Sequence, residues 1–410
     1  MQYNRALVNA IILASLTFPG VCCAQSAAPA ALAQAPAAQA QAPATQAQTP
    51  AAQAQTPAAQ AQAPATQAQA PAAQAQAPAT LAPRALDAKA FVKEARERKI
   101  AITHLYNYTW QALAAERRAL CYQAYNTASY IIPSRIKNGG FVKRNGLLYE
   151  DEYIKLKDNT RERVAKPVAI IFDIDETIID SSDLSLWMCQ HADTGYKASV
   201  SAYFHYIVLH PEARKYVPGS IEFIKQCYEW GITPIFLTGR NMAKRADTVA
   251  MLKDMFPHDT DIESRIINKN PEADHELGVK LLRELHVKDG DKLQQAVLNS
   301  TSSKTSNRLD LEFKYRVIGY FGDDLNDFPV YVPNNLDGAD TRTARDEQVD
   351  TYSHHFGLEW FVTPNANYGS WCEQSGISNF DPRTVLKAID TEDVRKFDTW
   401  YQQYREQQDK

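Results

Sequence analysis

The spacing of hydrophobic residues changes character along this chain. From Leu86 to about residue 132, apolar residues recur every three or four positions, which is typical of one or two amphipathic helices. After Pro167 the pattern becomes a continuous apolar run in VAIIFDID, and GITPIFLTGR and YRVIGYFGDDLND repeat that design farther along. Such apolar runs, each ending in polar residues, predict buried parallel strands.

Helical patterns separate these strands, namely GSIEFIKQCYEW, NMAKRADTVAMLKDMF and ADHELGVKLLRELH. Alternation of strands and helices predicts an α/β fold with a doubly wound, Rossmann-like parallel sheet. In such folds the ligand site lies beyond the carboxyl ends of the strands. We expect residues 86–410 to form one domain, with a smaller helical cap made from about 86–165 and 183–215.

Residues 1–24 have the pattern of a secretory signal peptide. Arg5 precedes a short apolar run from Ala6 to Phe18, and Pro19 interrupts that run before a stretch of small residues. The run is too short for a stable membrane span. We therefore expect the protein to be exported, to the periplasm, the outer membrane or the medium.

Residues 25–85 repeat a seven-residue unit such as QAQAPAT. Proline in each repeat excludes a continuous helix, so this composition predicts a disordered, semi-extended linker. The residues around Cys22 and Cys23 match a lipidation site poorly, and simple cleavage after Ala24 is the favoured alternative. An outer-membrane tether through a lipidated cysteine stays open.

The composition limits the class of partner. The formal net charge is −4 and the sequence pI is about 6.2, so there is no basic excess for a nucleic acid polymer or an anionic membrane surface. A small or acidic ligand would have to be held by individual side chains at its site, and not by an overall positive charge. Whether the protein forms a homodimer stays open. The remaining cysteines, which are Cys121, Cys189, Cys227 and Cys372, fit either disulfides or buried thiols.

Polar residues follow each of the three predicted strands. They are Asp173, Asp175 and Thr177, then Thr238, Gly239 and Arg240, and then Asp323, Asp324 and Asp327. The carboxyl ends of parallel strands meet at one crevice, so these side chains are expected to lie together. Carboxylates that lie within a few Å of one another repel unless protons or a cation neutralise their charge. Carboxylate oxygens are ligands that Mg²⁺ prefers, and the sequence has no cluster of His and Cys residues at the spacing of a zinc site. The expected metal is therefore Mg²⁺.

Four short segments carry a family resemblance. DIDET, FLTGR, SSKTSNR and GDDLND resemble the four motifs of the haloacid dehalogenase (HAD) superfamily. More narrowly, TWQALAAERRALCYQAYNTA, YVPGSIEFI, SSKTSNR, GDDLNDF and PNANYGSW resemble the class C bacterial acid phosphatases, the lipoprotein e family of outer-membrane proteins, from about Leu86 to Trp371. The resemblance implies a Mg²⁺-dependent hydrolase of phosphate monoesters, with nucleoside 5′-monophosphates as the expected substrates.

Hydrolysis of a phosphate ester requires a nucleophile, a proton donor and charge neutralisation. We expect Asp173 to attack phosphorus and form an aspartyl phosphate, and Asp175 to protonate the leaving oxygen and then activate water. Asp173, Asp323 and the backbone carbonyl of Asp175 are the expected Mg²⁺ ligands.

Further residues are expected to hold the phosphoryl group. The Thr238 hydroxyl and the backbone beside it, including Gly239 and Arg240, would bind phosphoryl oxygens at the entry to the next helix. Lys304 would bridge the phosphoryl group and the nucleophile. Three roles stay open for Asp324 and Asp327, which are orienting metal-bound water, orienting Lys304 and capping the following turn.

Aromatic residues of the cap region are candidates for stacking on a nucleobase. They are Trp187, Tyr196, Tyr203 and Phe204, with Trp371 farther along the chain, and each also fits core packing. Two alternative functions stay open. One is an exported binding or adhesion module that captures haem or nucleotides, with a vestigial site, although the presence of Asp173 argues against it. The other is a phosphatase or phosphotransferase for sugar or lipid phosphates.

Overall fold

The computed structural model of this protein describes residues 102–155, 161–190, 196–287, 294, 297–298, 304–330 and 338–373. The predicted signal peptide at 1–24 and linker at 25–85 lie outside these residues. No helix of the described part is both long and apolar enough to cross a lipid bilayer.

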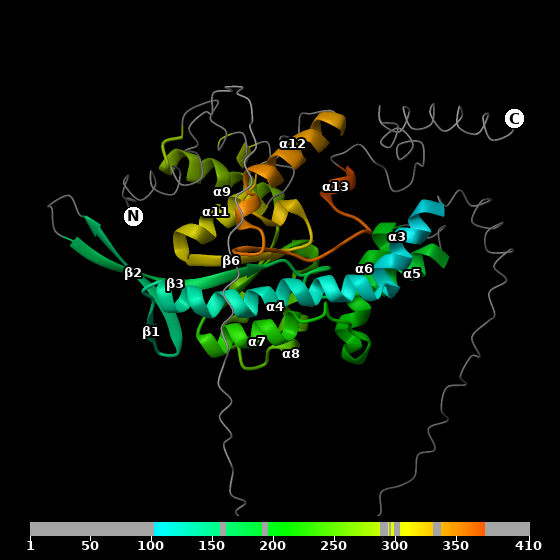
Figure 1. Ribbon diagram of the computed structural model, residues 1–410, viewed down its shortest axis with the longest axis horizontal. Coiled ribbons are helices and arrows are strands. Elements are labelled where there is room, and N and C mark those ends of the chain that lie inside the picture. The colour runs from blue at the N-terminus through cyan, green and yellow to red at the C-terminus, as the bar shows by residue number, and fades with distance from the viewer. Residues whose placement is uncertain are drawn as a thin grey trace, which may run out of the picture. The chain divides into compact units, whose positions relative to one another are not determined.

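The described elements are helices and strands, and helices lie between the successive strands from β3 to β7 (Figure 1). In chain order they are α3 (Ile102–Leu113), α4 (Ala115–Asn138), β1 (Val142–Arg144), β2 (Leu147–Lys155), β3 (Arg161–Phe172), α5 (Ser182–Gln190), α6 (Tyr196–Leu209), η1 (Pro211–Ala213), α7 (Ser220–Trp230), β4 (Thr233–Asn241), η2 (Met242–Lys244), α8 (Arg245–Met255), η3 (Ile262–Arg265), β5 (Ile266–Lys269), α9 (Pro271–Glu284), α11 (Lys304–Lys314), β6 (Arg316–Gly322), η4 (Leu325–Asp327), α12 (Gly338–Thr351), η5 (Ser353–His355), β7 (Trp360–Val362) and α13 (Ser370–Glu373).

The strands β3 to β7 form a parallel sheet in the spatial order β5-β4-β3-β6-β7. The first strand of this set lies in the centre and the chain then fills one side before the other, which is the order of a Rossmann-like fold. The predicted fold class is therefore confirmed. Phe172, the last residue of β3, pairs with Phe236 of β4 and Phe321 of β6, so the three predicted strands end at one edge of the sheet.

The structure corrects the N-terminal part of the predicted helical cap. That cap extended to residue 165, but β1, β2 and the first half of β3 form antiparallel strands there. Asn145 and Gly146 join β1 to β2, with φ of 48° and 85°. Asparagine followed by glycine favours such a two-residue hairpin turn, because both residues tolerate positive φ. This local signal was present in the sequence and outweighs the helical interpretation.

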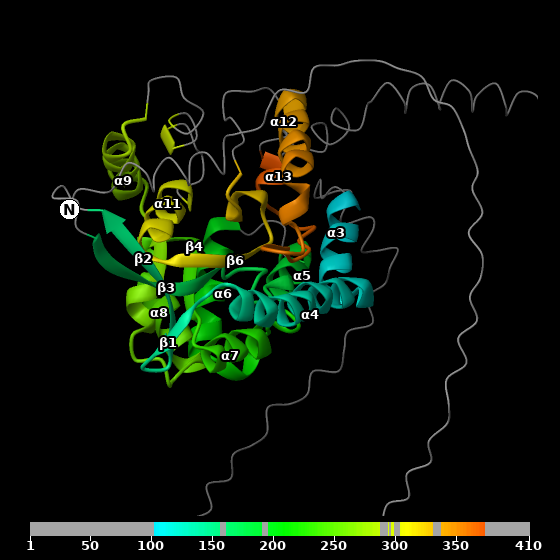
Figure 2. The ribbon, with the colours of Figure 1, turned by 60° about the vertical axis from the view of Figure 1, so that its left-hand side comes forward.

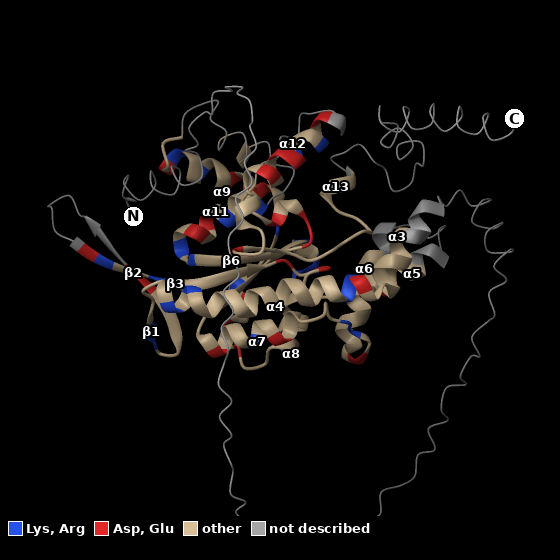
Figure 3. Ribbon diagram, in the orientation of Figure 1, with Lys and Arg blue, Asp and Glu red and all other residues tan. Residues whose placement is uncertain are grey.

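Helices cover both faces of the sheet. α4, α7 and α8 lie on one face, and α9, α11 and α12 lie on the other, as two views agree (Figures 1 and 2). α3, α5 and α6 pack together, and α6 also contacts α8. Acidic and basic residues both occur on individual helices, as Figure 3 shows for α11 and α12.

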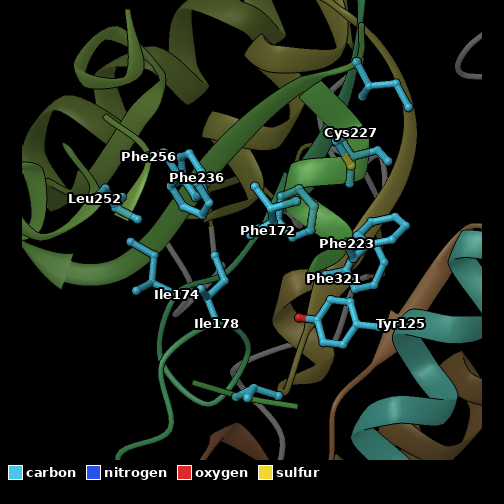
Figure 4. Packing of buried hydrophobic residues seen from close by; sticks show 14 of the residues in the cluster. Tyr125, Phe172, Ile174, Ile178, Phe223, Cys227, Phe236, Leu252, Phe256 and Phe321 are labelled. Carbon is cyan, nitrogen blue, oxygen red and sulfur yellow. The ribbon is translucent and has the colours of Figure 1, made fainter. Parts of the chain in front are cut away.

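Aromatic side chains fill the core beneath the carboxyl end of the central strands (Figure 4). Phe321 stacks on Phe172 at 5.0 Å between ring centroids and on Tyr125 of α4 at 4.9 Å. Phe223 of α7 lies against the same ring at 4.8 Å. This packing fixes the residues that immediately precede the polar ends of β3 and β6.

Three of the cysteines with open roles are described as buried thiols without a disulfide, namely Cys121, Cys227 and Cys372. Burial raises the pKa of the Cys121 thiol to about 11, which keeps it protonated. The side chain of Cys189 lies outside the described residues.

Candidate active site

Three carboxylates meet beyond the ends of β3 and β6. Asp173 directly follows β3, and Asp323 and Asp327 follow β6, with one oxygen of each side chain within 4.8 Å of the others. The backbone N–H of Asp173 donates to the carbonyl of Phe321 at 2.9 Å, which extends the β3–β6 pairing by one bond. The structure therefore brings together the predicted pair Asp173 and Asp323, and adds Asp327 to it.

Lys304, the first residue of α11, lies between two of these carboxylates. Its Nζ donates to Asp173 Oδ1 at 2.5 Å and to Asp327 Oδ1 at 2.6 Å. Gly322 allows this arrangement, because a Cβ there would lie 2.2 Å from the Cβ of Asp327. Of the three roles left open for Asp327, the contacts support two, which are orienting Lys304 through Oδ1 and capping η4 through Oδ2.

Asp324 has a structural role in the same loop. Its carboxylate accepts a hydrogen bond from the N–H of Asn326 at 2.9 Å and caps η4, while the Asp327 carboxylate accepts from the N–H of Asp324. Asp324 also accepts from the N–H and the hydroxyl of Ser370 at the start of α13. The capping role considered for Asp324 is thus the one that its contacts support.

The cluster of Asp173, Asp323 and Asp327 has more negative charge than Lys304 alone offsets. Burial raises the pKa of Asp173 to about 7, because the effect of desolvation and of repulsion by Asp327 exceeds the attraction of Lys304. Burial and repulsion by Asp173 also raise the pKa of Asp323. Burial lowers the pKa of Lys304, but Asp173 and Asp327 more than offset this and hold it above its usual range. One ammonium therefore faces two buried carboxylates, Asp173 and Asp327, and the half-buried carboxylate of Asp323.

A divalent metal ion fits this set of donors. All three side chains offer carboxylate oxygens, which are the ligands that hard cations prefer. A doubly charged ion would relieve the repulsion that raises their pKa values. Asp173, Asp323 and Asp327 are thus the side chains that could hold a metal, whereas the predicted ligation by the Asp175 carbonyl stays a prediction.

Asp175 pairs with a residue of β4. Its carboxylate accepts two hydrogen bonds from Arg240, from Nε at 2.9 Å and from Nη2 at 2.7 Å. The expected contact of the Arg240 backbone with phosphoryl oxygens stays a prediction, and the guanidinium of Arg240 pairs with Asp175. Such a two-point pair fixes the direction of the carboxylate as well as its position.

Thr238 and Gly239 lie in β4, which corrects the predicted local structure. We expected Thr238 at the entry to a helix, but β4 continues to Asn241 and α8 begins only at Arg245. The strand is prolonged because Asn241 still pairs with Lys269 of β5 after a register shift. Thr238 is buried, and a Cβ on exposed Gly239 would meet no atom within 4 Å, so the space beside this segment is open.

Two residues that the sequence interpretation did not assign hold Asp323 in place. The Asn365 side chain donates to Asp323 Oδ2 at 2.7 Å, and the Thr177 hydroxyl donates to Asp323 Oδ1 at 3.2 Å. Asn365 belongs to the PNANYGSW segment, whose resemblance was noted without a role for any asparagine. Its position directly after the last strand was the signal that could have identified it.

A second buried charge network anchors the loop that follows Asp173. Glu176 has a φ of 58°, in the left-handed region, and its buried carboxylate accepts from Gln111 Nε2 at 2.8 Å and Arg117 Nη2 at 3.0 Å. Ser181 donates to it through both its N–H and its hydroxyl. Arg117 also pairs with Asp180 at 2.5 Å. These bonds hold an unfavourable backbone conformation and tie α3 and α4 to the site.

Removal of Arg117 is expected to weaken the whole fold. Arg117→Met leaves the buried carboxylates of Glu176 and Asp180 without their cation, which should lower the free energy of unfolding by about 3–5 kcal/mol. Arg118→Met, at the exposed neighbouring position of the same helix, should change it by less than about 0.5 kcal/mol. Urea unfolding of the two variants measures the difference, and equal stabilities would contradict the proposed network.

The aromatic candidates differ in availability. The side chain of Trp187 on α5 is 40% exposed, whereas Phe204 of α6 is buried, 4.0 Å from the guanidinium carbon of Arg240. Tyr203 packs edge-on against Phe204, and the Trp371 Nε1–H donates to the carbonyl of Tyr368 at 3.1 Å. The side chain of Tyr196 lies outside the described residues. The ring of Phe204 thus already contacts the guanidinium of Arg240. Trp187 is the most exposed of the described candidates.

Comparison with known proteins identifies relatives of the chain. The model of a family described as "HAD superfamily, subfamily IIIB (Acid phosphatase)" matches residues 80–371, which is more than half of the sequence. A solved structure of the class C acid phosphatase from Bacillus anthracis is 19% identical, with a TM-score of 0.48, over 73% of this chain and 95% of that one. The same phosphatase with tungstate bound is 18% identical, with a TM-score of 0.49, over 71% and 97% of the two chains.

Proposed function

Since this chain belongs to subfamily IIIB of the HAD superfamily and is therefore an acid phosphatase, we propose that it is an exported, Mg²⁺-dependent enzyme for nucleoside 5′-monophosphates that acts through an aspartyl phosphate on Asp173. The observation that supports this most strongly is the position of Asp173. It lies at the end of the central strand, in contact with Lys304 and within reach of Asp323 and Asp327.

Asp173 is the proposed nucleophile. Lys304 holds one of its oxygens at 2.5 Å, which leaves the other oxygen for attack on phosphorus. The attack forms a bond from Asp173 to phosphorus while the bond from phosphorus to the alcohol oxygen breaks. Lys304 then lies beside the transferred group, where its positive charge offsets the negative charge that the phosphoryl oxygens carry in the transition state.

Mg²⁺ is the proposed metal, because Asp173, Asp323 and Asp327 offer oxygen donors and no sulfur or imidazole. When bound, it would supply positive charge to the three carboxylates and to the phosphoryl oxygens. Asn365 and Thr177 would keep Asp323 in position for this role.

Asp175 is the proposed proton donor and, in the second step, the proton acceptor. In this structure Arg240 binds both of its carboxylate oxygens. For Asp175 to protonate the leaving alcohol, one oxygen has to separate from the guanidinium. After the alcohol leaves, the same carboxylate removes a proton from the water that attacks the aspartyl phosphate.

The proposed substrate class rests on the family resemblance and on Trp187, whose exposed ring on α5 is able to stack on a base. Thr238 and the open backbone at Gly239 are the proposed contacts of the phosphoryl oxygens. Export also stays a prediction, since residues 1–24 lie outside the described part. A binding module with a vestigial site is disfavoured, because Asp173, Asp175 and Lys304 are all present.

Hydrolysis by the full chain is expected to depend on a divalent metal. The purified protein should release phosphate from an aryl phosphate with Mg²⁺, lose at least about 100-fold in rate with excess EDTA, and recover when Mg²⁺ is restored. A panel of nucleotides, sugar phosphates and lipid phosphates measured in the same assay identifies the preferred alcohol. Full activity after removal of all bound metal would refute the proposed metal site, and a preference for sugar or lipid phosphates would refute the nucleotide assignment.

A further inference from the structure

Lys244 is a cation near the proposed site that the mechanism above does not use. It ends η2, the short turn between β4 and α8, and its ammonium lies 5.1 Å from the centroid of the Phe204 ring. Among the residues that the structure describes, its Nζ forms no hydrogen bond and no ion pair. An ammonium over an aromatic ring is only partly compensated by the ring electrons, so it retains the capacity to bind an anion.

The same ring connects Lys244 to the proposed proton donor. The guanidinium carbon of Arg240 lies 4.0 Å from the centroid of Phe204, and Arg240 donates two hydrogen bonds to Asp175. Lys244 and the Arg240 that holds Asp175 therefore lie against the same ring. Arg240 also has a buried Nη1 without an acceptor in the described part of the chain. Both cations thus have hydrogen-bonding capacity that the protein does not satisfy.

Asp175 and Arg240 form an ion pair, so their charges offset each other. Asp247 on α8 pairs with His205, the residue after Phe204, so Lys244 is the cation here that forms no ion pair within the described part of the chain. Burial lowers the pKa of Lys244, the attraction of Asp175 opposes this, and Arg240 adds repulsion, so the three groups lie within electrostatic reach of one another. An anion bound close to both cations would relieve that repulsion.

A proton donor for the leaving group has to lie next to the alcohol part of the substrate. If Asp175 has that role, the alcohol lies on the side of Asp175 that faces Arg240, Phe204 and Lys244. The phosphoryl group, in contrast, lies against Asp173 and Lys304, with charges of its own to neutralise it. Lys244 is therefore placed to bind the alcohol and not the transferred phosphoryl group.

We propose that Lys244, with Arg240, forms an anion subsite that selects phosphate monoesters whose alcohol carries a second negative group, such as a carboxylate or a further phosphate. The inference rests on the proposed phosphatase function and narrows its substrate class. Within the proposed nucleotide class, it favours substrates whose nucleoside carries a second phosphate.

Two aryl esters of similar size test this subsite. Carboxyphenyl phosphate carries the second anion, at the meta or para position, and carbamoylphenyl phosphate replaces that anion by a neutral amide. For the full-length protein with Mg²⁺, the ratio of kcat/KM for carboxyl over carbamoyl ester should fall about tenfold on Lys244→Met. A factor of ten corresponds to about 1.4 kcal/mol of binding. Comparing ratios between wild type and variant removes the difference in intrinsic reactivity of the two esters.

Two further variants distinguish the loss of the Lys244 charge from a general effect of substituting a lysine. Lys244→Arg, which keeps the charge, should retain most of the preference, and added salt should weaken it in the wild type. Lys253→Met, in the adjoining helix α8 and paired with Glu263, should leave both rates unchanged. Equal losses on both esters in Lys244→Met would overturn the inference, since they would place Lys244 at the phosphoryl group, and so would an unchanged ratio. Failure of the wild type to hydrolyse either ester would instead overturn the proposed function.

Discussion

Asp173→Asn is expected to reduce kcat by roughly 10⁴- to 10⁶-fold for every phosphate ester tested, from nucleotides to acidic phenols. The amide lacks the negative oxygen that attacks phosphorus, so no covalent intermediate forms, whatever the leaving group. The loss should therefore be independent of the leaving-group pKa. Steady-state release of phosphate from a series of esters measures it.

A surface carboxylate provides the control for this substitution. Asp310 on α11 pairs with exposed Lys314, one helical turn away, and Asp310→Asn should leave kcat within about twofold. Thermal unfolding should show that Asp173→Asn remains folded, because the variant removes one of three mutually repelling carboxylates. Retention of more than a few per cent of activity by Asp173→Asn would mean that another group is the nucleophile.

Asp175→Asn is expected to give a defect that depends on the leaving group. The amide keeps an oxygen that accepts a hydrogen bond from Arg240, so the local structure should persist, but it has no proton to donate. The first step should slow by roughly 10²- to 10⁴-fold for a nucleoside, which leaves as a basic alkoxide, and by less than about tenfold for an acidic phenol. Rapid measurement of the first turnover with both kinds of ester tests this.

An equal loss for both kinds of ester would contradict the assignment of Asp175. It would indicate that the substitution damages the placement of Arg240 or of the loop after β3. The conclusion would then be that Asp175 is a positioning residue whose carboxylate fixes Arg240.

Much of the fold follows from local sequence patterns. The apolar runs before Asp173, Gly239 and Gly322 each identify a strand of the parallel sheet, and their ends coincide because Phe172 pairs with both neighbouring strands. The β1–β2 hairpin was missed although Asn145 and Gly146 signal its turn. We expected the cap to be helical as far as residue 165, and this expectation gave no weight to the turn that Asn145 and Gly146 favour.

Side-chain partners were harder to predict than side-chain positions. Arg240 lies near the carboxyl end of β4, in a segment where the pairing with β5 shifts register, and the sequence reveals neither this shift nor the pairing of Arg240 with Asp175. Asn365 and Gln111 reach the site from opposite ends of the domain, and Gln111 also accepts from the N–H of Ala366. Such contacts join residues far apart in the chain, so they depend on the packed tertiary structure and not on local propensity.

The most direct test of the account is to trap the covalent intermediate in Asp175→Asn. This variant should release a stoichiometric burst of an acidic phenol, because the first step proceeds while the second lacks its base. After acid quenching, mass spectrometry should then find one phosphoryl group on the peptide that contains Asp173. If the phosphoryl group lies on another residue, or if Asp173→Asn gives the burst and Asp175→Asn does not, the central assignment is wrong.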